Sequence, residues 1–111
     1  MRLTYHLTPT EWWAAAEPDG PLGAPSLDVE GFIHCTDGAA NMVATANRHY
    51  AADPRDFLVL LVDLDRLTSR WSVDDKAGIY PHIFGPIDRA AIVETMPAPR
   101  DPDGTFLPFT A

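Results

Sequence analysis

Five side chains in this sequence are the best candidates for chemistry, four histidines and one cysteine: His6, His34, Cys35, His49 and His82. His34 and Cys35 are neighbours in the stretch EGFIHCT, residues 30–36, which has the composition of a short strand. Successive side chains on a strand point to opposite faces, so these two cannot meet as a cysteine–histidine nucleophilic pair. We therefore predict that Cys35 is a small buried hydrophobic residue rather than a nucleophile.

His6 and His34 are the predicted catalytic residues. On a first strand His6 shares a face with Thr8, and on a second strand His34 shares a face with Thr36. If the two strands are neighbours with this face in common, both imidazoles and both hydroxyls line one cleft. The alternative is a pair of half-exposed histidines that hydrogen-bond backbone groups.

His82 lies in the segment YPHIFGPI, where Tyr80, His82 and Phe84 share one face if the chain is extended. Such a row of rings can stack on a flat ligand, and the alternative is a structural loop whose histidine bonds the backbone. His49 follows Arg48 at the end of a predicted helix, where a cation complements the helix dipole. We interpret His49 as a helix-terminal residue.

A metal site is a weaker interpretation of the same histidines. Three histidines can hold a catalytic zinc ion, and His6, His34 and His82 are the candidates. They are 28 and 48 residues apart, and the chain has no closely spaced ligand pair of the kind seen in zinc motifs. We therefore expect no metal, although a histidine-based, metal-dependent hydrolase is kept as the third functional alternative.

The elements that must position these residues follow from hydrophobic patterning and turn residues. Thr8, Pro9 and Glu11 have the spacing of a helix-capping box, and Asp37 is placed to cap a second helix. Prolines and glycines make residues 17–30 a predicted loop, and the run FLVLLV reads as a central strand covered on both faces. The pattern predicts strands at 3–7, 30–36, 57–62, 70–73 and 91–96, and helices at 9–16 and 37–50. Two short helices among several antiparallel strands indicate an α+β fold.

Composition narrows the possible partners. The chain has 111 residues, the size of one domain, and a net charge of −8. Non-specific nucleic-acid binding requires clustered Lys and Arg, so we do not expect it. No apolar run approaches the ~20 residues that span a bilayer, and we expect no membrane association. One cysteine and no signal-peptide pattern fit a cytoplasmic protein. The sequence does not determine the oligomeric state.

Several of these segments together resemble a known family. They are YHLT (5–8), EGFIHCT (30–36), ANRHY (46–50), FLVLLVDLDRL (57–67), RW (70–71) and YPHIFGPI (80–87). The set resembles the domain-of-unknown-function family numbered 952, small and mostly bacterial proteins, over residues 3–96 in the right order. We therefore expect one domain over residues 1–96 and a proline-rich tail over 97–111, extended over the surface.

The resemblance implies a fold similar to the ADP-ribosyltransferase superfamily, in which a split antiparallel sheet holds NAD, with the RNA 2′-phosphotransferases as the nearest branch. His6 would then hold the ribose hydroxyls, with His34 nearby on the next strand. The ring of the ligand would face Tyr80, His82 or Phe84.

Two features depart from that superfamily. Its toxins use a late-strand glutamate, for which this chain offers only Glu94, in a pattern that suits an exposed position. Its RNA 2′-phosphotransferases use several basic residues, and the arginines here are dispersed.

Three functions follow, in order of preference. The first is an enzyme that cleaves NAD or transfers ADP-ribose, with NAD as substrate and Arg48 on the pyrophosphate. The second is a non-catalytic domain that binds a nucleotide or another small molecule. The third is the metal-dependent hydrolase.

Overall fold

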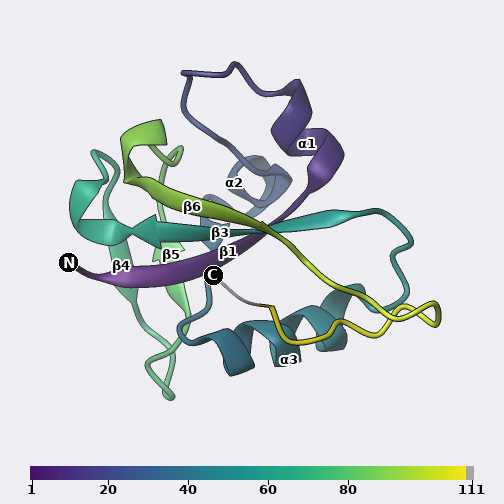
Figure 1. The fold of residues 1–111 in the computed structure, drawn as a ribbon. Coiled ribbons are helices and arrows are strands. Elements are labelled where there is room, and N and C mark those ends of the chain that lie inside the picture. Colours follow the sequence, from purple (N-terminus) through teal and green to yellow (C-terminus); the bar gives the residue numbers. More distant parts are fainter. Residues whose placement is uncertain (110–111) are drawn as a thin grey trace.

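The computed structural model describes residues 1–109, which form two antiparallel three-stranded sheets with three α-helices (Figure 1). The strand order is β1-β3-β6 in the large sheet and β2-β5-β4 in the small one. The strands are β1 Leu3–Pro9, β2 Ile33–His34, β3 Phe57–Asp63, β4 Trp71–Val73, β5 Pro81–Ile83 and β6 Ile92–Pro97. The helices are α1 Thr10–Ala15, α2 Pro25–Glu30 and α3 Ala39–Tyr50, with short 3-10 turns at Leu64–Arg66 and Arg89–Ala91. The predicted α+β class is confirmed.

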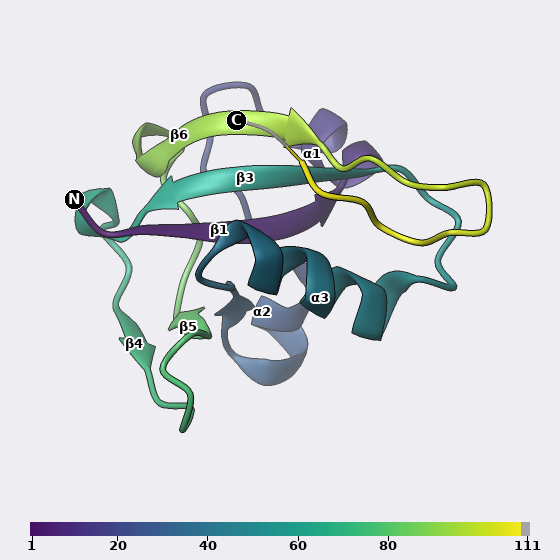
Figure 2. The same ribbon diagram turned by 60° about the horizontal axis from the view of Figure 1, so that its bottom comes forward.

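The central strand β3 is covered on both faces, as its apolar run predicts. Leu60 and Val62 belong to the core between the two sheets, together with buried Ile33 and Ile83. Val59, on the other face, packs against α3 and the C-terminal tail. Figure 2 shows α3 running along β1 on that second side of the large sheet.

The two sheets are joined at one point between β1 and the end of β2. The Tyr5 N–H donates to the Thr36 carbonyl at 3.0 Å, and the Thr36 N–H donates to the Tyr5 carbonyl at 2.8 Å. On its other side β2 pairs with β5, with Ile33 opposite Ile83 and His34 opposite His82. The predicted strand over 30–36 is therefore only two residues of regular strand followed by this bridge.

Helix α1 does not begin with the predicted capping box. Strand β1 continues to pair with β3 through Pro9, and Thr8 is buried there at 2% exposure. The Thr8 hydroxyl is thus held inside the sheet, and no side-chain cap forms at the start of α1. Burial and strand pairing outweigh a local capping preference worth about 1 kcal/mol.

The predicted loop over 17–30 is wrong in its second half, where α2 forms. Pro25 occupies the first turn of this helix, where its fixed backbone angle is favourable and its missing N–H costs nothing. Leu27 packs against the core between the sheets. Gly31 ends the helix in the left-handed conformation, with φ of 86°, and so turns the chain into β2.

The predicted cap of α3 is also wrong, because Asp37 has another partner. Its carboxylate accepts two hydrogen bonds from the Arg2 guanidinium, at 3.0 and 2.7 Å. Gly38 takes the N-cap position without a side-chain bond. The predicted apolar face of the helix is confirmed, since Met42 and Ala46 are buried.

The C-terminal tail does more than extend over the surface. Residues 100 and 106 form a bridge, and Phe106 is buried at 4% exposure against Ala46 and Phe57. The Arg100 guanidinium donates to the carbonyls of Tyr50 and Ala51 at the end of α3. The tail thus completes the core between α3 and β3. Its last residues, 110–111, lie outside the described part of the chain.

Among residues 1–109, no helix is both long and apolar enough to cross a bilayer.

Candidate functional site

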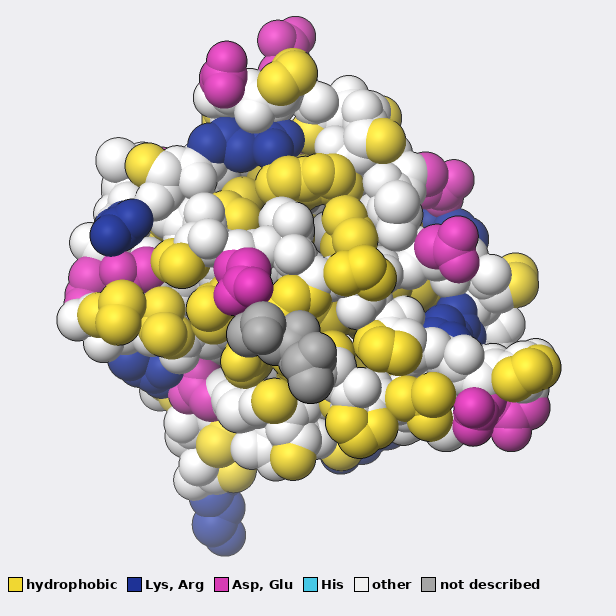
Figure 3. Space-filling model, in the orientation of Figure 1, with side chains coloured by type: hydrophobic (Ala, Val, Ile, Leu, Met, Phe, Trp, Pro, Cys, Tyr) yellow, Lys and Arg dark blue, Asp and Glu magenta, His cyan; other side chains and the backbone are white. Residues whose placement is uncertain are grey.

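Three strands present a polar and aromatic surface on the outer face of the small sheet. Pro81 and Ile83 point into the core, so His82 between them points outward. His34 and Ser72 are its cross-strand partners in β2 and β4, which makes a row of three side chains on this face. Figure 3 shows the molecule in the orientation of Figure 1, and no histidine side chain is visible on that side.

Rings gather beside that row. Phe32 stacks on His82, with centroids 4.0 Å apart and planes 11° from parallel. His34 lies edge-on to both rings, at 4.8 Å from Phe32 and 5.6 Å from His82. Phe84 is 6.1 Å from Phe32. We call Phe32, His34, His82 and Phe84 the aromatic–imidazole cluster.

The carboxylate of Glu30 is hydrogen-bonded to this cluster. Glu30, the last residue of α2, accepts a hydrogen bond from Nε2 of His34, and both side chains are about half exposed, at 47% and 56%. In a neutral imidazole whose Nε2–H donates to the carboxylate, Nδ1 of His34 carries the lone pair. No group among residues 1–109 makes a hydrogen bond to Nδ1, which leaves it available as a base.

Glu30 and Phe32 were missed as site residues by sequence reasoning. Both were assigned to one strand, on which Glu30, Phe32 and His34 would merely alternate with core residues. The helix-ending Gly31 instead separates Glu30, on α2, from Phe32 and His34. The signal that could have found Glu30 is a carboxylate four residues before a histidine, with a glycine between them.

Arg48 of α3 and Tyr80, which precedes β5, are in contact. The Arg48 guanidinium lies 3.4 Å from the Tyr80 hydroxyl, and this contact lowers the pKa of Tyr80 below its usual value. The Asp75 carboxylate accepts from the backbone N–H groups of Ile79 and Tyr80, which fixes the turn before β5. These two predicted ligand-contacting residues are therefore brought together, although they start from different elements.

His6 is placed differently from the prediction. It is 5% exposed, and its Nδ1 lies 2.7 Å from the backbone carbonyl of His34. Because a carbonyl only accepts, Nδ1 carries the proton and Nε2 the lone pair. Nε2 is buried and has no hydrogen-bond partner among the described residues. Burial lowers the pKa of His6, the bond to the His34 carbonyl opposes this, and the nearby His34 charge adds to the lowering.

The predicted cleft lined by both imidazoles does not form. His6 contacts the backbone of His34 from inside, whereas the His34 ring is on the outer face with Glu30. Thr8 and Thr36 are buried, at 2% and 3% exposure, because β1 and the end of β2 form the junction of the two sheets. The interpretation of Cys35 is confirmed: it is buried, and burial raises the pKa of its thiol.

Glu94 does not lie on the His6 side of the large sheet. In the ladder it is opposite Leu61, and Leu61 is opposite Tyr5, so these three share the face that α3 covers in part. His6 pairs with Leu60 on the other face.

His6, His34 and His82, the candidate metal ligands, do not form a common ligand set in the described residues. Within residues 1–109 no group of three His, Cys, Asp or Glu side chains is arranged to hold a metal ion.

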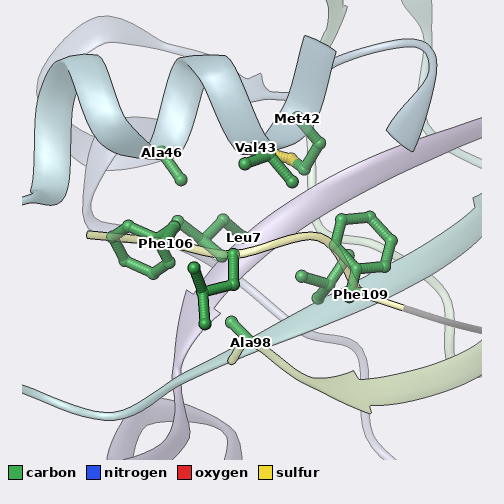
Figure 4. Close-up of a pocket in the computed structure, with 9 residues that line it drawn as sticks. Leu7, Met42, Val43, Ala46, Ala98, Phe106 and Phe109 are labelled. Atoms are coloured by element: carbon green, nitrogen blue, oxygen red, sulfur yellow. The ribbon is translucent and has the colours of Figure 1, made fainter. Parts of the chain in front are cut away.

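Two hollows lie away from the cluster. One is an apolar gap between α3 and the tail, toward which Leu7, Met42 and Phe109 point (Figure 4). The other is an open depression lined by both charged and apolar side chains, among them Arg89, Asp88 and Pro86. Neither includes a residue of the aromatic–imidazole cluster.

Comparison with known proteins adds a family and a fold. A family model described as "Protein of unknown function (DUF952)" matches residues 7–95. Two crystal structures of protein CC0527 from Caulobacter crescentus, one of them of a double mutant, are similar to this chain. Each superposes with a TM-score of 0.76 over 95% of this chain and 93% of the other, at 20% and 21% sequence identity. No curated protein matches.

Proposed function

The chain belongs to the DUF952 family, whose function is unknown, and from its own surface we propose that it binds NAD or a similar nucleotide and breaks the bond between ribose and nicotinamide. The observation that carries this proposal is the Glu30–His34 pair beside three stacked or edge-on rings. A flat, electron-poor ring is what such a cluster can hold, since aromatic stacking contributes about 1–3 kcal/mol for each base.

The arrangement of strands supports an ADP-ribosyltransferase-like reading of the fold. In that superfamily NAD lies where an antiparallel sheet splits. Here β1 and β2 pair only at Tyr5 and Thr36, and beyond that bridge the imidazole of His6 bonds to the His34 carbonyl in place of a backbone N–H. The proposed site is on β2 immediately before this junction.

His34 is the proposed general base. The carbon–nitrogen bond at ribose C1′ breaks, the electron pair leaves with neutral nicotinamide, and the sugar becomes an oxocarbenium ion. The oxygen of water or of an acceptor hydroxyl then bonds to C1′, and its proton passes to Nδ1 of His34. The Glu30 carboxylate orients the imidazole and stabilises the imidazolium that forms. General-base catalysis of this kind contributes about 10²–10⁴-fold.

Arg48 is proposed to attract the pyrophosphate of the same ligand. It is exposed and contacts Tyr80, which is two residues before His82 of the cluster. The side chains of Thr8 and Thr36 are buried, so this proposal gives them no direct contact with the ligand.

A second function has one specific observation in its favour. Glu94, the late-strand carboxylate that could have assisted cleavage, shares a face with Tyr5 and Leu61 rather than with His6. A domain that binds the nucleotide without cleaving it needs no such group. Binding and cleavage must therefore be measured separately.

Binding is tested by an amide chemical-shift titration with NAD and with ADP-ribose. We expect shifts over residues 30–36 and 80–85 that disappear in His34→Ala. The matched control is His49→Ala, which removes an exposed histidine from α3 and should leave the titration unchanged. Absence of shifts in the wild-type protein at millimolar ligand would refute both functions.

Cleavage is tested by nicotinamide release. Glu30→Gln keeps the size of the side chain but removes its charge, so we expect nucleotide binding to persist while release falls by about 10²-fold or more. Saturable binding of NAD by the wild-type protein with no nicotinamide released would leave only the binding function.

A further inference from the structure

Arg70 occupies the end of the outer face opposite to Glu30. The Phe84 N–H donates to the Arg70 carbonyl at 2.8 Å, which continues the β4–β5 ladder one step beyond Trp71 and Ile83. Because side chains alternate, Arg70 is on the same face as Ser72, and Phe84 is on the same face as His82. The guanidinium of Arg70 lies over the Phe84 ring, 4.7 Å from its centroid.

This guanidinium has no acidic partner within residues 1–109. No carboxylate of the described chain lies within 4.0 Å of it, whereas Arg2, Arg55 and Arg66 each form an ion pair. In a protein with a net charge of −8, an exposed arginine that lies over a ring and has no carboxylate partner is well placed to bind an anionic ligand.

The two edges of this face therefore carry opposite charges. A carboxylate is attached to the β2 side through His34, the rings occupy the middle, and a cation projects from the β4 side. Strands β2 and β4 flank β5, so their axes are about 10 Å apart, two strand spacings. A ligand matching this pattern has a ring at the centre and an anionic group at one end, which describes a nucleoside phosphate.

We infer that Arg70 is the specificity-determining residue of this site and that it binds the 5′-phosphate of the nucleotide whose ring rests on the aromatic–imidazole cluster. The inference rests on the proposed function: Arg48 attracts the pyrophosphate as a whole, and Arg70 makes the selective contact with the 5′-phosphate. A planar guanidinium can donate two parallel hydrogen bonds to a phosphate, and the contact with the Phe84 ring restricts where the Arg70 side chain can lie. Arg48 instead directs its guanidinium toward the Tyr80 hydroxyl.

The test compares two probes that differ only in the phosphate, nicotinamide mononucleotide and nicotinamide riboside. Dissociation constants are measured by chemical-shift titration for the wild-type protein and for Arg70→Gln, Arg70→Lys, Arg48→Gln and Arg66→Gln. Arg66 is the matched control, since it is exposed and lies on the 3-10 turn after β3. Thermal unfolding of each variant shows whether it is folded.

We expect the wild-type protein to prefer the mononucleotide by about tenfold, the scale of one charge-assisted contact. Arg70→Gln should abolish this preference and Arg70→Lys should retain part of it, because lysine keeps the charge without the fork. Arg66→Gln, the control, should keep the preference. Added salt should weaken mononucleotide binding in the wild-type protein more than in Arg70→Gln.

Four results would overturn the inference. If the wild-type protein binds both probes equally, or if Arg70→Gln keeps the preference, Arg70 does not read the phosphate, although the proposed function survives. If only Arg48→Gln loses the preference, the phosphate contact belongs to Arg48. If neither probe binds, the proposed function and the inference fall together.

Discussion

Phe106→Ala gives a direct measure of how far the tail contributes to the core. The Phe106 ring is 5.7 Å from that of Phe57, and the Arg100 guanidinium lies 4.3 Å from its centroid. Asn47 holds the backbone of Phe106 in place through two hydrogen bonds, of 2.7 and 3.1 Å. Because the backbone is fixed, removal of the ring should leave a cavity rather than a collapsed tail.

The expected loss follows from that geometry. A buried phenylalanine truncated to alanine costs about 3–5 kcal/mol, and the lost arginine–ring contact adds about 0.5–1 kcal/mol. Phe106 also lines the apolar gap between α3 and the tail, so neighbouring side chains have room to relax (Figure 4). We therefore expect about 3 kcal/mol, which at about 4 °C per kcal/mol lowers the melting temperature by about 12 °C.

Urea unfolding of the wild-type protein and of Phe106→Ala measures this loss. Pro108→Ala, which changes an exposed residue of the same tail, is the control and should alter the free energy of unfolding by less than about 0.5 kcal/mol. A loss below about 1 kcal/mol in Phe106→Ala would refute the reasoning. It would mean that the tail lies on the surface without packing, as its proline content alone predicts.

Further outcomes are expected elsewhere in the fold. The lowered pKa of His6 means that the unfolded chain binds more protons below pH 6.5, so stability is complete above that pH and falls as the pH drops toward the folded pKa. His6→Asn should remove this slope of up to about 1.4 kcal/mol per pH unit, as measured by urea unfolding between pH 7 and 5. Gly104→Ala should lower the free energy of unfolding by at least about 1–3 kcal/mol, because φ is +97° and a Cβ would lie 2.4 Å from the carbonyl oxygen after α3. In Gly23→Ala the new Cβ would have no neighbouring atom within 4 Å, so the free energy of unfolding should be nearly unchanged when measured in the same way. Arg48→Gln should raise the pKa of Tyr80 toward 10.0, observed by NMR of the Tyr80 ring, and an unchanged midpoint would show that the guanidinium contact does not act on the phenol.

Local elements could be predicted where one strong pattern dominates. The apolar run of β3 and the apolar spacing of α3 are intrinsic to their residues, and both elements form where the patterns place them. Boundaries failed where a side chain had two possible partners. Thr8 was free to cap a helix or to enter the sheet, and Asp37 to cap a helix or to bind Arg2; only long-range contacts decide such cases.

The sequence by itself determined the α+β class, the placement of Cys35 on the face opposite to His34 and the shared face of His82 and Phe84, because alternation along a strand fixes which side chains share a face. Only the tertiary structure decided which faces meet solvent. Alternation places His6 and His34 on comparable faces of two strands, yet the junction at Tyr5 and Thr36 buries one imidazole and exposes the other. It also brings Glu30 to His34 through a helix that ends at a left-handed glycine. Such proximity depends on where separate elements pack, which no local pattern encodes.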